Sequence, residues 1–406
     1  MSTPTYAHGR YSGDGSHLFW LAFRTGLLTI LTLGIYRFWA KTRVRRYIWS
    51  SVLLDDSRFE YTGTGLEKFL GFLMAVVFLA IYLGVVQIVL FYFGLTLFRE
   101  PDSPEDIVAQ VVAGYVTVLS VVPFLFFAIY RARRYRMART RWRGIRFGMD
   151  KAAGGYALRA MGYWLLTILS LGLLLPLQTF RLEKYMVDRT WFGDARFHQG
   201  GRWTALYRRM LHIFIGLAIL LAAVIGAALS ADNTAFLVLP FVATPVGLVW
   251  LAVGFISFRV QSFAYLAQNT TLGGTVAFDA RPSTPKVILT WIHGSLLVGL
   301  VISIIVAILG GAGAIVFGGV LSMAEGDPGG GTIAATVVLA VMGYVLVLVG
   351  GDAGALVAIT QPILRHYVET TTLINLPALA DIQQRAADPG ADAEGFADAL
   401  DVGGAF

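Results

Sequence analysis

Long apolar runs that end in clusters of Lys and Arg constrain this chain more than any other feature. The run Phe69–Phe98 contains no charged residue, and the run Ile107–Tyr130 is followed by eight arginines between positions 131 and 146. A helix needs about 20 apolar residues to cross a bilayer core of about 30 Å. Only 14% of the residues are charged, whereas about a quarter are charged in a soluble domain. The sequence therefore predicts a multi-pass membrane protein and argues against a soluble α/β enzyme.

The positive charge of the chain follows the ends of the apolar runs. A net charge of +7 is a nucleic-acid signal only where the cations gather on a polar surface, and here they flank membrane segments and mark topology. We therefore predict no nucleic-acid partner. The chain has no cysteine, which excludes disulfides, Cys-ligated zinc and thiol catalysis. Its N-terminus is polar and rich in Gly and Ser, and we see no removable signal peptide in it.

A long internal repeat organises the apolar runs. The stretch Leu27–Gly63 matches Leu165–Gly201 without a gap after a shift of 138 positions, and LLTILTLG in the first becomes LLTILSLG in the second. Self-similarity at this level indicates repeated structural units. Weaker copies of the second half occur near Tyr135, Tyr265 and Tyr367. Approximate units are 10–130, 131–258 and 259–372 of one membrane domain, with a cytoplasmic tail at 373–406.

Equivalent repeats should lie on the same side of the membrane, which fixes the predicted topology. If every basic copy is cytoplasmic, six apolar segments cross the bilayer: Phe69–Phe98, Ile107–Tyr130, Met210–Leu229, Ala235–Phe258, Val287–Met323 and Ile333–Leu364. The first and fourth segments, Leu18–Trp39 and Tyr163–Gln178, then have both ends inside. We predict that each is a re-entrant or interfacial helical hairpin, bent near Gly34 or Gly172. The alternative is eight plain spans with the repeats on opposite faces.

The predicted fold class is therefore an all-α polytopic membrane protein with six spanning helices, two helical hairpins and internal repeats. Both termini are expected in the cytoplasm. The polar segments around Asp55-Asp56-Ser57 and Gly193-Asp194 predict small cytoplasmic β-hairpins, because turn residues separate β-prone runs there. Apolar positions from Leu373 to Ile382 predict one short amphipathic helix.

Several motifs resemble one known family. The segments GDGSHLFW, LLTILTLGIYRFWAKTRVRRYIWS and RFEYTGTG are similar to the signature of the YjgN family of bacterial inner-membrane proteins, which carries a domain of unknown function. The C-terminal segment from Glu394 to Asp401 also resembles that family. Arg24 and Phe38 depart from the family pattern, which more often has a small polar residue and Pro there. The resemblance implies a bacterial cytoplasmic membrane and no reaction.

Two ionisable residues fall inside predicted spans, where such residues are costly and often functional. His293 lies about two turns into its segment, and Asp352 lies about three turns from the cytoplasmic end of the last one. We predict that they form a candidate intramembrane polar site that relays protons or binds a cation. The alternative is that Asp352 is solvated in a cytoplasmic vestibule or caps a broken helix. The sequence predicts no catalytic residue, no metal ligands and no cofactor.

Basic and aromatic residues at the inner membrane interface form the second candidate site. Each cation near anionic lipid gains about 1 kcal/mol, and Tyr and Trp favour the same depth. The candidates are Arg43, Arg45, Arg46, Tyr47, Trp49, Arg131, Arg133, Arg134, Tyr135, Arg181 and Tyr185. The alternatives are pure topology marking, or pairing of Arg133 and its copies with Asp56, Glu60, Asp188 or Asp194.

Two functions remain open at the level of sequence, and an enzyme has the least support. Repeats and broken helices favour a channel or transporter for a small solute, which architecture alone ranks slightly first. The second is a non-catalytic membrane module that binds anionic lipid head groups, or scaffolds partners, through its basic cytoplasmic face. The sequence leaves the oligomeric state and the substrate open.

Overall fold

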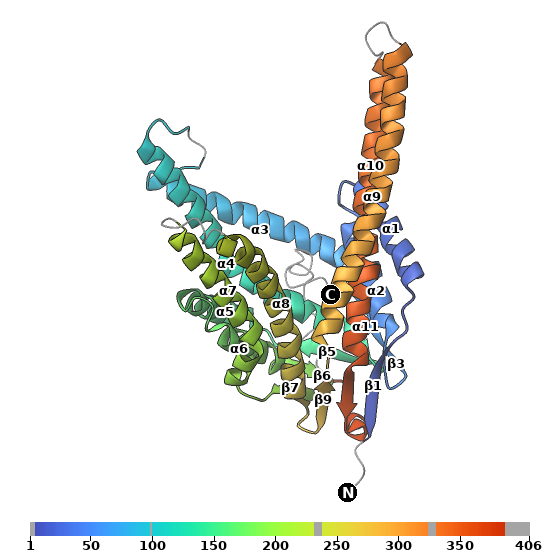
Figure 1. The fold of residues 1–406 in the computed structure, drawn as a ribbon. Coiled ribbons are helices and arrows are strands. Elements are labelled where there is room, and N and C mark those ends of the chain that lie inside the picture. The colour runs from blue at the N-terminus through green and yellow to red at the C-terminus, as the bar shows by residue number, and fades with distance from the viewer. Residues whose placement is uncertain (1–4, 98–99, 231–237, 324–329, 386–406) are drawn as a thin grey trace.

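Ten short strands close into an antiparallel barrel at one end of the molecule (Figure 1). The computed structural model describes residues 5–97, 100–230, 238–323 and 330–385. The strands follow the order β1-β10-β9-β8-β7-β6-β5-β4-β3-β2, and β1 also pairs with β2, which closes the ring. Their bounds are β1 Tyr6–Tyr11, β2 Val52–Leu54, β3 Ser57–Tyr61, β4 Thr140–Trp142, β5 Ile145–Met149, β6 Thr190–Phe192, β7 Ala195–Gln199, β8 Thr270–Leu272, β9 Val276–Ala280 and β10 Thr371–Ile374.

The barrel shows that the predicted all-α class is wrong. The hairpins foreseen at Asp55-Asp56-Ser57 and Gly193-Asp194 exist, and they join other hairpins in one closed sheet. Closure satisfies the backbone groups that an isolated hairpin would leave exposed at its edges. The class is therefore mixed, with a β-barrel that carries long helices.

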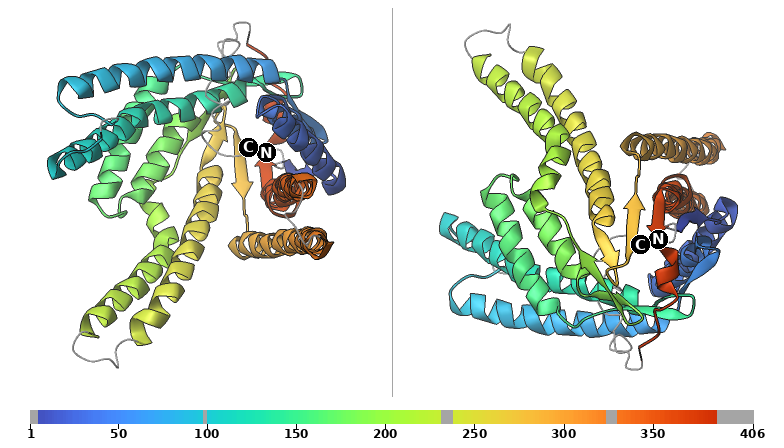
Figure 2. Two further views of the ribbon diagram at one scale, coloured as in Figure 1. Left: turned by 90° about the horizontal axis from the view of Figure 1, so that it is seen from above. Right: turned by 90° about the horizontal axis from the view of Figure 1, so that it is seen from below.

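Helical hairpins are inserted between the strand pairs. The helices are α1 Gly15–Leu31, α2 Arg37–Ser51, α3 Gly65–Tyr92, α4 Pro104–Ala138, α5 Ala153–Leu169, α6 Leu175–Val187, the 3₁₀ helix η1 Trp203–Met210, α7 Leu211–Leu229, α8 Val238–Gln268, α9 Thr284–Met323, α10 Gly330–Ala355, the π-helix η3 Leu356–Thr360, α11 Gln361–Glu369 and the 3₁₀ helix η4 Leu376–Leu379. Seen along the barrel axis, the hairpins point away from the barrel in different directions (Figure 2).

Six helical stretches of the described residues are long and apolar enough to cross a membrane, which confirms that part of the prediction. They are Gly65–Tyr92, Pro104–Ala138, Trp203–Leu229, Val238–Gln268, Thr284–Gly311 and Val337–Glu369. Between 6% and 28% of each apolar window is buried inside the protein. Most of the apolar surface of these helices is therefore available to lipid, which is where a membrane helix exposes such surface.

The two short apolar segments form helical hairpins that bend at the predicted glycines. Gly34 has φ +91° between α1 and α2, and Gly172 has φ +87° between α5 and α6. Each glycine N–H donates to the carbonyl of a threonine five residues earlier, at 2.7 Å in both hairpins. A left-handed residue at this point favours glycine because it has no Cβ to clash. The same local sequence thus gives the same turn twice.

Aromatic side chains fill the barrel. Phe59, Phe147, Phe197 and Phe278 come from alternate hairpin strands and point inward, because side chains alternate between the two faces of a strand. Their rings stack in sequence at centroid distances of 6.2, 6.4 and 6.0 Å. The buried residues packed with them are Ala7, Trp142, Phe192, Leu272, Val276, Leu373, Leu379 and Ile382. The barrel interior is therefore a hydrophobic core.

The segment after β10 covers the end of the barrel that lies away from the helices. Leu373 belongs to β10, and only Leu376–Leu379 form a helix, the 3₁₀ helix η4, so the predicted amphipathic helix from Leu373 to Ile382 is wrong in its length. The backbone N–H of Asp194, in the β6–β7 turn, donates to the carbonyl of Gln383 at 2.9 Å. Leu379 and Ile382 close the aromatic core from this side. The rest of the predicted tail, from residue 386, lies outside the described residues.

Candidate lipid-facing site at the helix–barrel junction

A repeated clasp joins the two helices of each hairpin next to the barrel. Tyr47 on α2 accepts from the backbone N–H of Asp14 at 2.6 Å and donates to its carbonyl at 2.8 Å, just before α1. Tyr265 does the same with Arg202 before η1, at 2.7 and 3.1 Å. The hydroxyl of Tyr185 donates to the carbonyl of Ala152 at 3.1 Å. The end of each returning helix is thereby fixed to the start of the outgoing helix.

Two further units vary this clasp. Tyr135 on α4 donates to the carboxylate of Glu67 in the first turn of α3, at 2.9 Å. His366 on α11 accepts from the N–H of Ser283 through Nε2, at 2.8 Å. Each clasp residue stands five positions before the first residue of the next strand. In the fifth copy the clasp position is therefore occupied by His366, and the sequence alignment through Tyr367 is one residue out of register.

Four of the eleven predicted interface residues are buried and hold the fold together. Arg45 and Tyr135 are 4% and 0% exposed, and Arg134 and Tyr185 are 7% and 9% exposed. The guanidinium of Arg45 donates to the hydroxyl of Tyr61 at 3.3 Å, and that of Arg134 donates to the carbonyl of Met149 at 3.1 Å. Buried polar groups are stable only with such partners. These four side chains therefore serve mainly to hold neighbouring elements together.

Arg133 makes a two-pronged ion pair with Glu183 on α6, with both N–O distances at 2.8 Å. Such bidentate contacts fix geometry as well as charge. The carboxylates suggested from the sequence have other cationic partners in two cases, because Asp56 pairs with Arg10 and Asp188 pairs with Lys184. The ion pair thus joins α4 to the neighbouring short hairpin. Close by, burial raises the pKa of the Tyr156 hydroxyl to about 12.

The remaining predicted interface residues face outward to different extents. Arg43, Arg46 and Arg181 are exposed. Arg131 and Trp49 are half-buried, with the Arg131 guanidinium over the Phe127 ring at 5.7 Å and the Trp49 indole N–H bonded to the Thr140 hydroxyl at 2.9 Å. The second cluster predicted from the sequence is thus divided between structural residues and a layer of exposed arginines.

The structure places His293 and Asp352 at different heights on the α9–α10 pair. Gly294 packs against the carbonyl of Ala358, whereas Gly351 packs against Ile302. The seven residues from Gly351 to Ala358 span about 10 Å of helix. His293 is exposed on α9, and Asp352 lines a groove of about 710 Å³ between α10 and the α1–α2 hairpin. Among the described contacts, no hydrogen bond or ion pair joins His293 to Asp352.

Two apolar spaces were not foreseen from the sequence. A cavity of about 260 Å³ lies at the helix side of the barrel, lined by Trp49, Phe59, Met137, Phe147 and Leu364 among others. A groove of about 690 Å³ lies between α3, α4 and α5, with Arg131 in its lining. To predict either space, one must know how helices from different repeats pack together, and the hydrophobic periodicity of the sequence does not show this. Within the described ranges, no group of three or more His, Asp or Glu residues could hold a metal ion.

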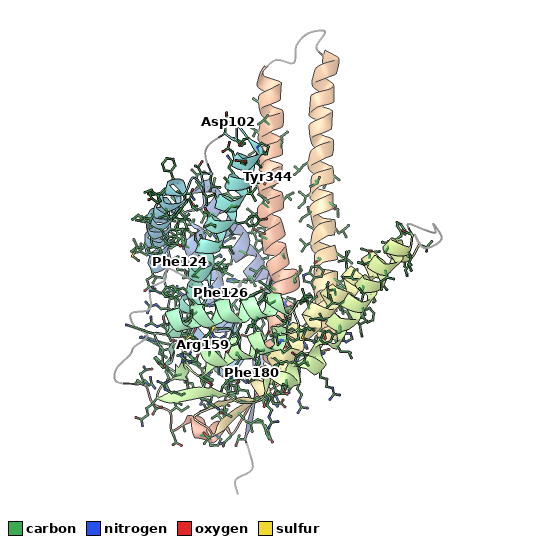
Figure 3. All side chains as sticks on the ribbon, turned by 90° about the vertical axis from the view of Figure 1, so that its left-hand side faces the viewer. Asp102, Phe124, Phe126, Arg159, Phe180 and Tyr344 are labelled. Carbon is green, nitrogen blue, oxygen red and sulfur yellow. The ribbon has the colours of Figure 1, made fainter. Side chains whose placement is uncertain are left out.

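The two ends of the long helix α4 differ in charge. Its first turn carries Glu105 and Asp106 and its last turn, next to β4, carries Arg136; in Figure 3, Asp102, which precedes α4, lies at the end remote from the barrel. This gradient is the one that the positive-inside rule describes. Fold and charge together define a polytopic membrane protein whose helical hairpins are tied at one end by a small closed barrel.

Comparison with known proteins gives the family. A family model described as a bacterial protein of unknown function (DUF898) matches residues 7–399, and the chain belongs to this family, which includes the YjgN proteins. The inner membrane protein YjgN of Escherichia coli O157:H7 is 29% identical over 155 residues, which is 38% of this chain and 34% of that protein.

Two further relatives carry the same name. YjgN of Escherichia coli K12 is 27% identical over 156 residues, covering 38% of this chain and 34% of the relative. YjgN of Salmonella typhimurium is 26% identical over 140 residues, covering 34% and 30%. The matched region thus spans about a third of the length of these curated relatives. No solved structure matches the chain.

Proposed function

We propose that this protein is a non-catalytic module of the bacterial inner membrane that binds anionic lipid head groups through the arginines at its helix–barrel junction. One observation carries the proposal. The barrel is closed, so it gathers the basic ends of helices from every repeat into one layer between the barrel and the apolar spans. We orient the protein with the barrel and both termini in the cytoplasm, in keeping with the positive-inside bias.

The exposed arginines of that layer supply the attraction. Arg43, Arg46 and Arg181 are exposed on α2 and α6, and each cation near an anionic surface contributes about 1 kcal/mol. The buried arginines take no part, because they bond to neighbouring side chains and carbonyls. Binding at this layer depends on charge and weakens with salt.

The short hairpins support the same orientation. Leu33 and Leu171, at the two tips, are 95% and 89% exposed. The turn amides are bonded within each hairpin, and Thr32 Oγ1 and Ser170 Oγ accept from the N–H groups of Tyr36 and Leu174 at 2.9 and 3.0 Å. Backbone can enter hydrocarbon only when its polar groups are satisfied in this way. We propose that both tips dip into the cytoplasmic leaflet.

The barrel interior is the reason that we prefer this function to a channel. A pore along the barrel axis needs a polar, open path, and stacked phenylalanines occupy that axis in the described structure. Polar rings and wetted constrictions are what make pores conduct. A transport path between the helices would have to pass beside the barrel, because the described barrel has no opening for it.

Lipid retention tests the proposal. The double variant Arg43→Glu/Arg181→Glu is purified from mixed phosphatidylglycerol and phosphatidylcholine nanodiscs beside the wild type, and co-purifying lipid is measured by mass spectrometry. We expect the excess of phosphatidylglycerol over phosphatidylcholine to fall about 30-fold, because two lost contacts of about 1 kcal/mol each amount to about 2 kcal/mol. The control, Arg58→Glu/Arg385→Glu, makes the same charge change on β3 and after η4, at arginines for which the described structure gives no ion pair. Equal loss in both variants, or no loss in the first, would refute the proposal.

A further inference from the structure

The groove between α10 and the α1–α2 hairpin is lined by charges of both signs among apolar and threonine side chains. Asp352 comes from α10, and Arg37, Lys41 and Arg45 come from α2. Arg37 and Lys41 are four residues apart on one helix, so they project on the same face. Ile30, Val44, Leu348 and Val349 supply apolar lining. The groove is thus amphipathic, and its volume of about 710 Å³ lies in the range of small-molecule sites, roughly 300–1,000 Å³.

The groove lies on the inner-leaflet side of the membrane. The apolar span that contains Asp352 begins at Val337, so Asp352 lies 15 residues, or about 22 Å, along a hydrocarbon core of about 30 Å. With the barrel on the cytoplasmic side, Asp352 lies in the inner part of the membrane, towards the head groups of the inner leaflet.

Two threonines of the groove, Thr25 and Thr29, can only accept further hydrogen bonds. Thr25 donates its hydroxyl proton to the carbonyl of Leu21 at 2.8 Å, and Thr29 donates to the carbonyl of Thr25 at 2.8 Å. A hydroxyl whose proton is used still has an acceptor lone pair. Together with the Asp352 carboxylate, these oxygens favour a ligand group with several N–H donors.

The lining also discriminates between kinds of ammonium group. Quaternary ammonium groups are recognised by aromatic side chains, and none of the described residues that line this groove is aromatic. A primary ammonium, by contrast, donates charge-assisted bonds to carboxylate and hydroxyl oxygens. Arg37 and Lys41 supply the complementary donors for a phosphate.

The helix wall is irregular at this place. The π-helix η3, Leu356–Thr360, follows α10 directly, and Leu356 and Thr360 both line the groove. A π turn inside a helix widens it by one residue and occurs often at binding sites. It places Thr360 in the groove, below Asp352 on the barrel side.

From this arrangement we infer that the groove binds the head group of a phospholipid that carries both a phosphate and a primary ammonium, of the phosphatidylethanolamine type. Arg37 and Lys41 hold the phosphate, Asp352 holds the ammonium, and the acyl chains leave along the apolar wall towards the bilayer. This site is separate from the exposed arginine layer, and it selects the head group by its ammonium rather than by net negative charge.

A competition between three lipids tests the inference. The protein is reconstituted in nanodiscs with equal amounts of phosphatidylethanolamine, phosphatidylcholine and phosphatidylglycerol, extracted in mild detergent, and its retained lipid is quantified by mass spectrometry. In the Arg43→Glu/Arg181→Glu background, which removes the phosphatidylglycerol excess of the arginine layer, we expect phosphatidylethanolamine to be enriched about tenfold over each of the others, a difference of about 1.4 kcal/mol. Equal retention of all three lipids would overturn the inference.

Variants of the charged groove residues test the ammonium-binding and phosphate-binding roles separately. In Asp352→Asn we expect the preference over phosphatidylglycerol to disappear while total retained phospholipid persists, and in Arg37→Gln/Lys41→Gln we expect retention of all three lipids to fall. Asp352→Glu should keep the preference, which separates loss of the carboxylate from misfolding. Arg24→Gln is the matched control, because Arg24 is exposed on α1 and is not among the groove residues.

Two outcomes distinguish this inference from the proposed function. An Asp352→Asn variant with an unchanged lipid preference refutes the ammonium site and leaves the arginine layer untouched. Loss of phosphatidylglycerol excess in Arg43→Glu/Arg181→Glu, with phosphatidylethanolamine enrichment preserved, supports both sites as independent. An intact phosphatidylglycerol excess in that variant refutes the arginine layer alone.

Discussion

The two short helical hairpins share a shape and differ in charge. Their tips are nearly superimposable in conformation, with φ +50° at Leu33 and +52° at Leu171. Across the shift of 138 positions, however, Arg37 corresponds to Leu175, Lys41 to Thr179 and Arg45 to Glu183. The residues that make the turn and the clasp are therefore repeated, while those that face α10 in the first hairpin are replaced in the second. The comparison thus distinguishes the residues that form the hairpin fold from the residues that face α10.

The largest expected effect concerns the tips. Leu33→Asp and Leu171→Asp each place a carboxylate where a leucine is 95% or 89% exposed, and a charge in hydrocarbon costs about 3 kcal/mol. We expect both variants to lower the thermal unfolding temperature in nanodiscs far more than in detergent. A loss for only one tip would show that the hairpins sit in different surroundings.

The second prediction concerns Glu183, a position at which the two hairpins differ, because the first hairpin has Arg45 there. Glu183→Gln removes the carboxylate that pairs with Arg133, whose side chain is 25% exposed. Loss of one partner of a largely buried pair leaves the other charge uncompensated; with partial solvent screening we expect about 2 kcal/mol of destabilisation. Chemical denaturation measures it, and the double variant Arg133→Gln/Glu183→Gln should recover part of the loss. No recovery would mean that Glu183 acts through other contacts.

A third effect should be the same in both hairpins. Gly34→Ala and Gly172→Ala each force a side chain into the left-handed region, at φ +91° and +87°, for about 1–2 kcal/mol. Nothing lies within 4 Å of a Cβ built at either glycine, so the cost is conformational. Unequal losses in denaturant midpoint would contradict the view that the two turns are equivalent.

The smallest effect tests the clasp. Tyr47→Phe and Tyr185→Phe each remove a hydroxyl that bonds to the backbone before α1 or α5, at a cost of about 1 kcal/mol. We expect faster amide exchange in the first turn of α1 or α5, confined to the altered unit. Exchange that rises throughout the protein would show that the clasps act together.

The sequence predicts the repeat, the six apolar helices and the two bends because each of these leaves a local trace. The hydrophobic length of a span and a glycine between two leucine-rich stretches are visible without any partner. The barrel leaves no such trace. Strands such as Val52–Leu54 and Thr140–Trp142 have three residues, and β3 pairs with β4 across a helical hairpin of nearly 80 residues.

The candidate site was predictable in part. Clusters of arginine follow the apolar runs in the sequence, and the structure gathers the ends of these runs in one layer next to the barrel. Which arginine is buried depends on neighbours from other repeats, as with Arg134 and the Met149 carbonyl or Arg133 and Glu183. The strand Tyr6–Tyr11 escaped notice because its inward positions, Ala7, Gly9 and Tyr11, include small residues and lack a β-branched one. Glycine is required at position 9 because a Cβ there would collide with the carbonyl of Val368.

The ring of strands is sealed by its first and last members, β1 and β10. During synthesis the earliest strand must wait for almost the whole chain before it meets this neighbour, while β2 occupies its other edge. Until then β1 and β9 each present an unsatisfied edge, which is a site for wrong pairing. The N–H of Asn375 already donates to the carbonyl of Thr5 at 3.1 Å. A circular permutant that connects the two ends after η4 and opens the chain at another strand turn would therefore form the same barrel from a different first strand.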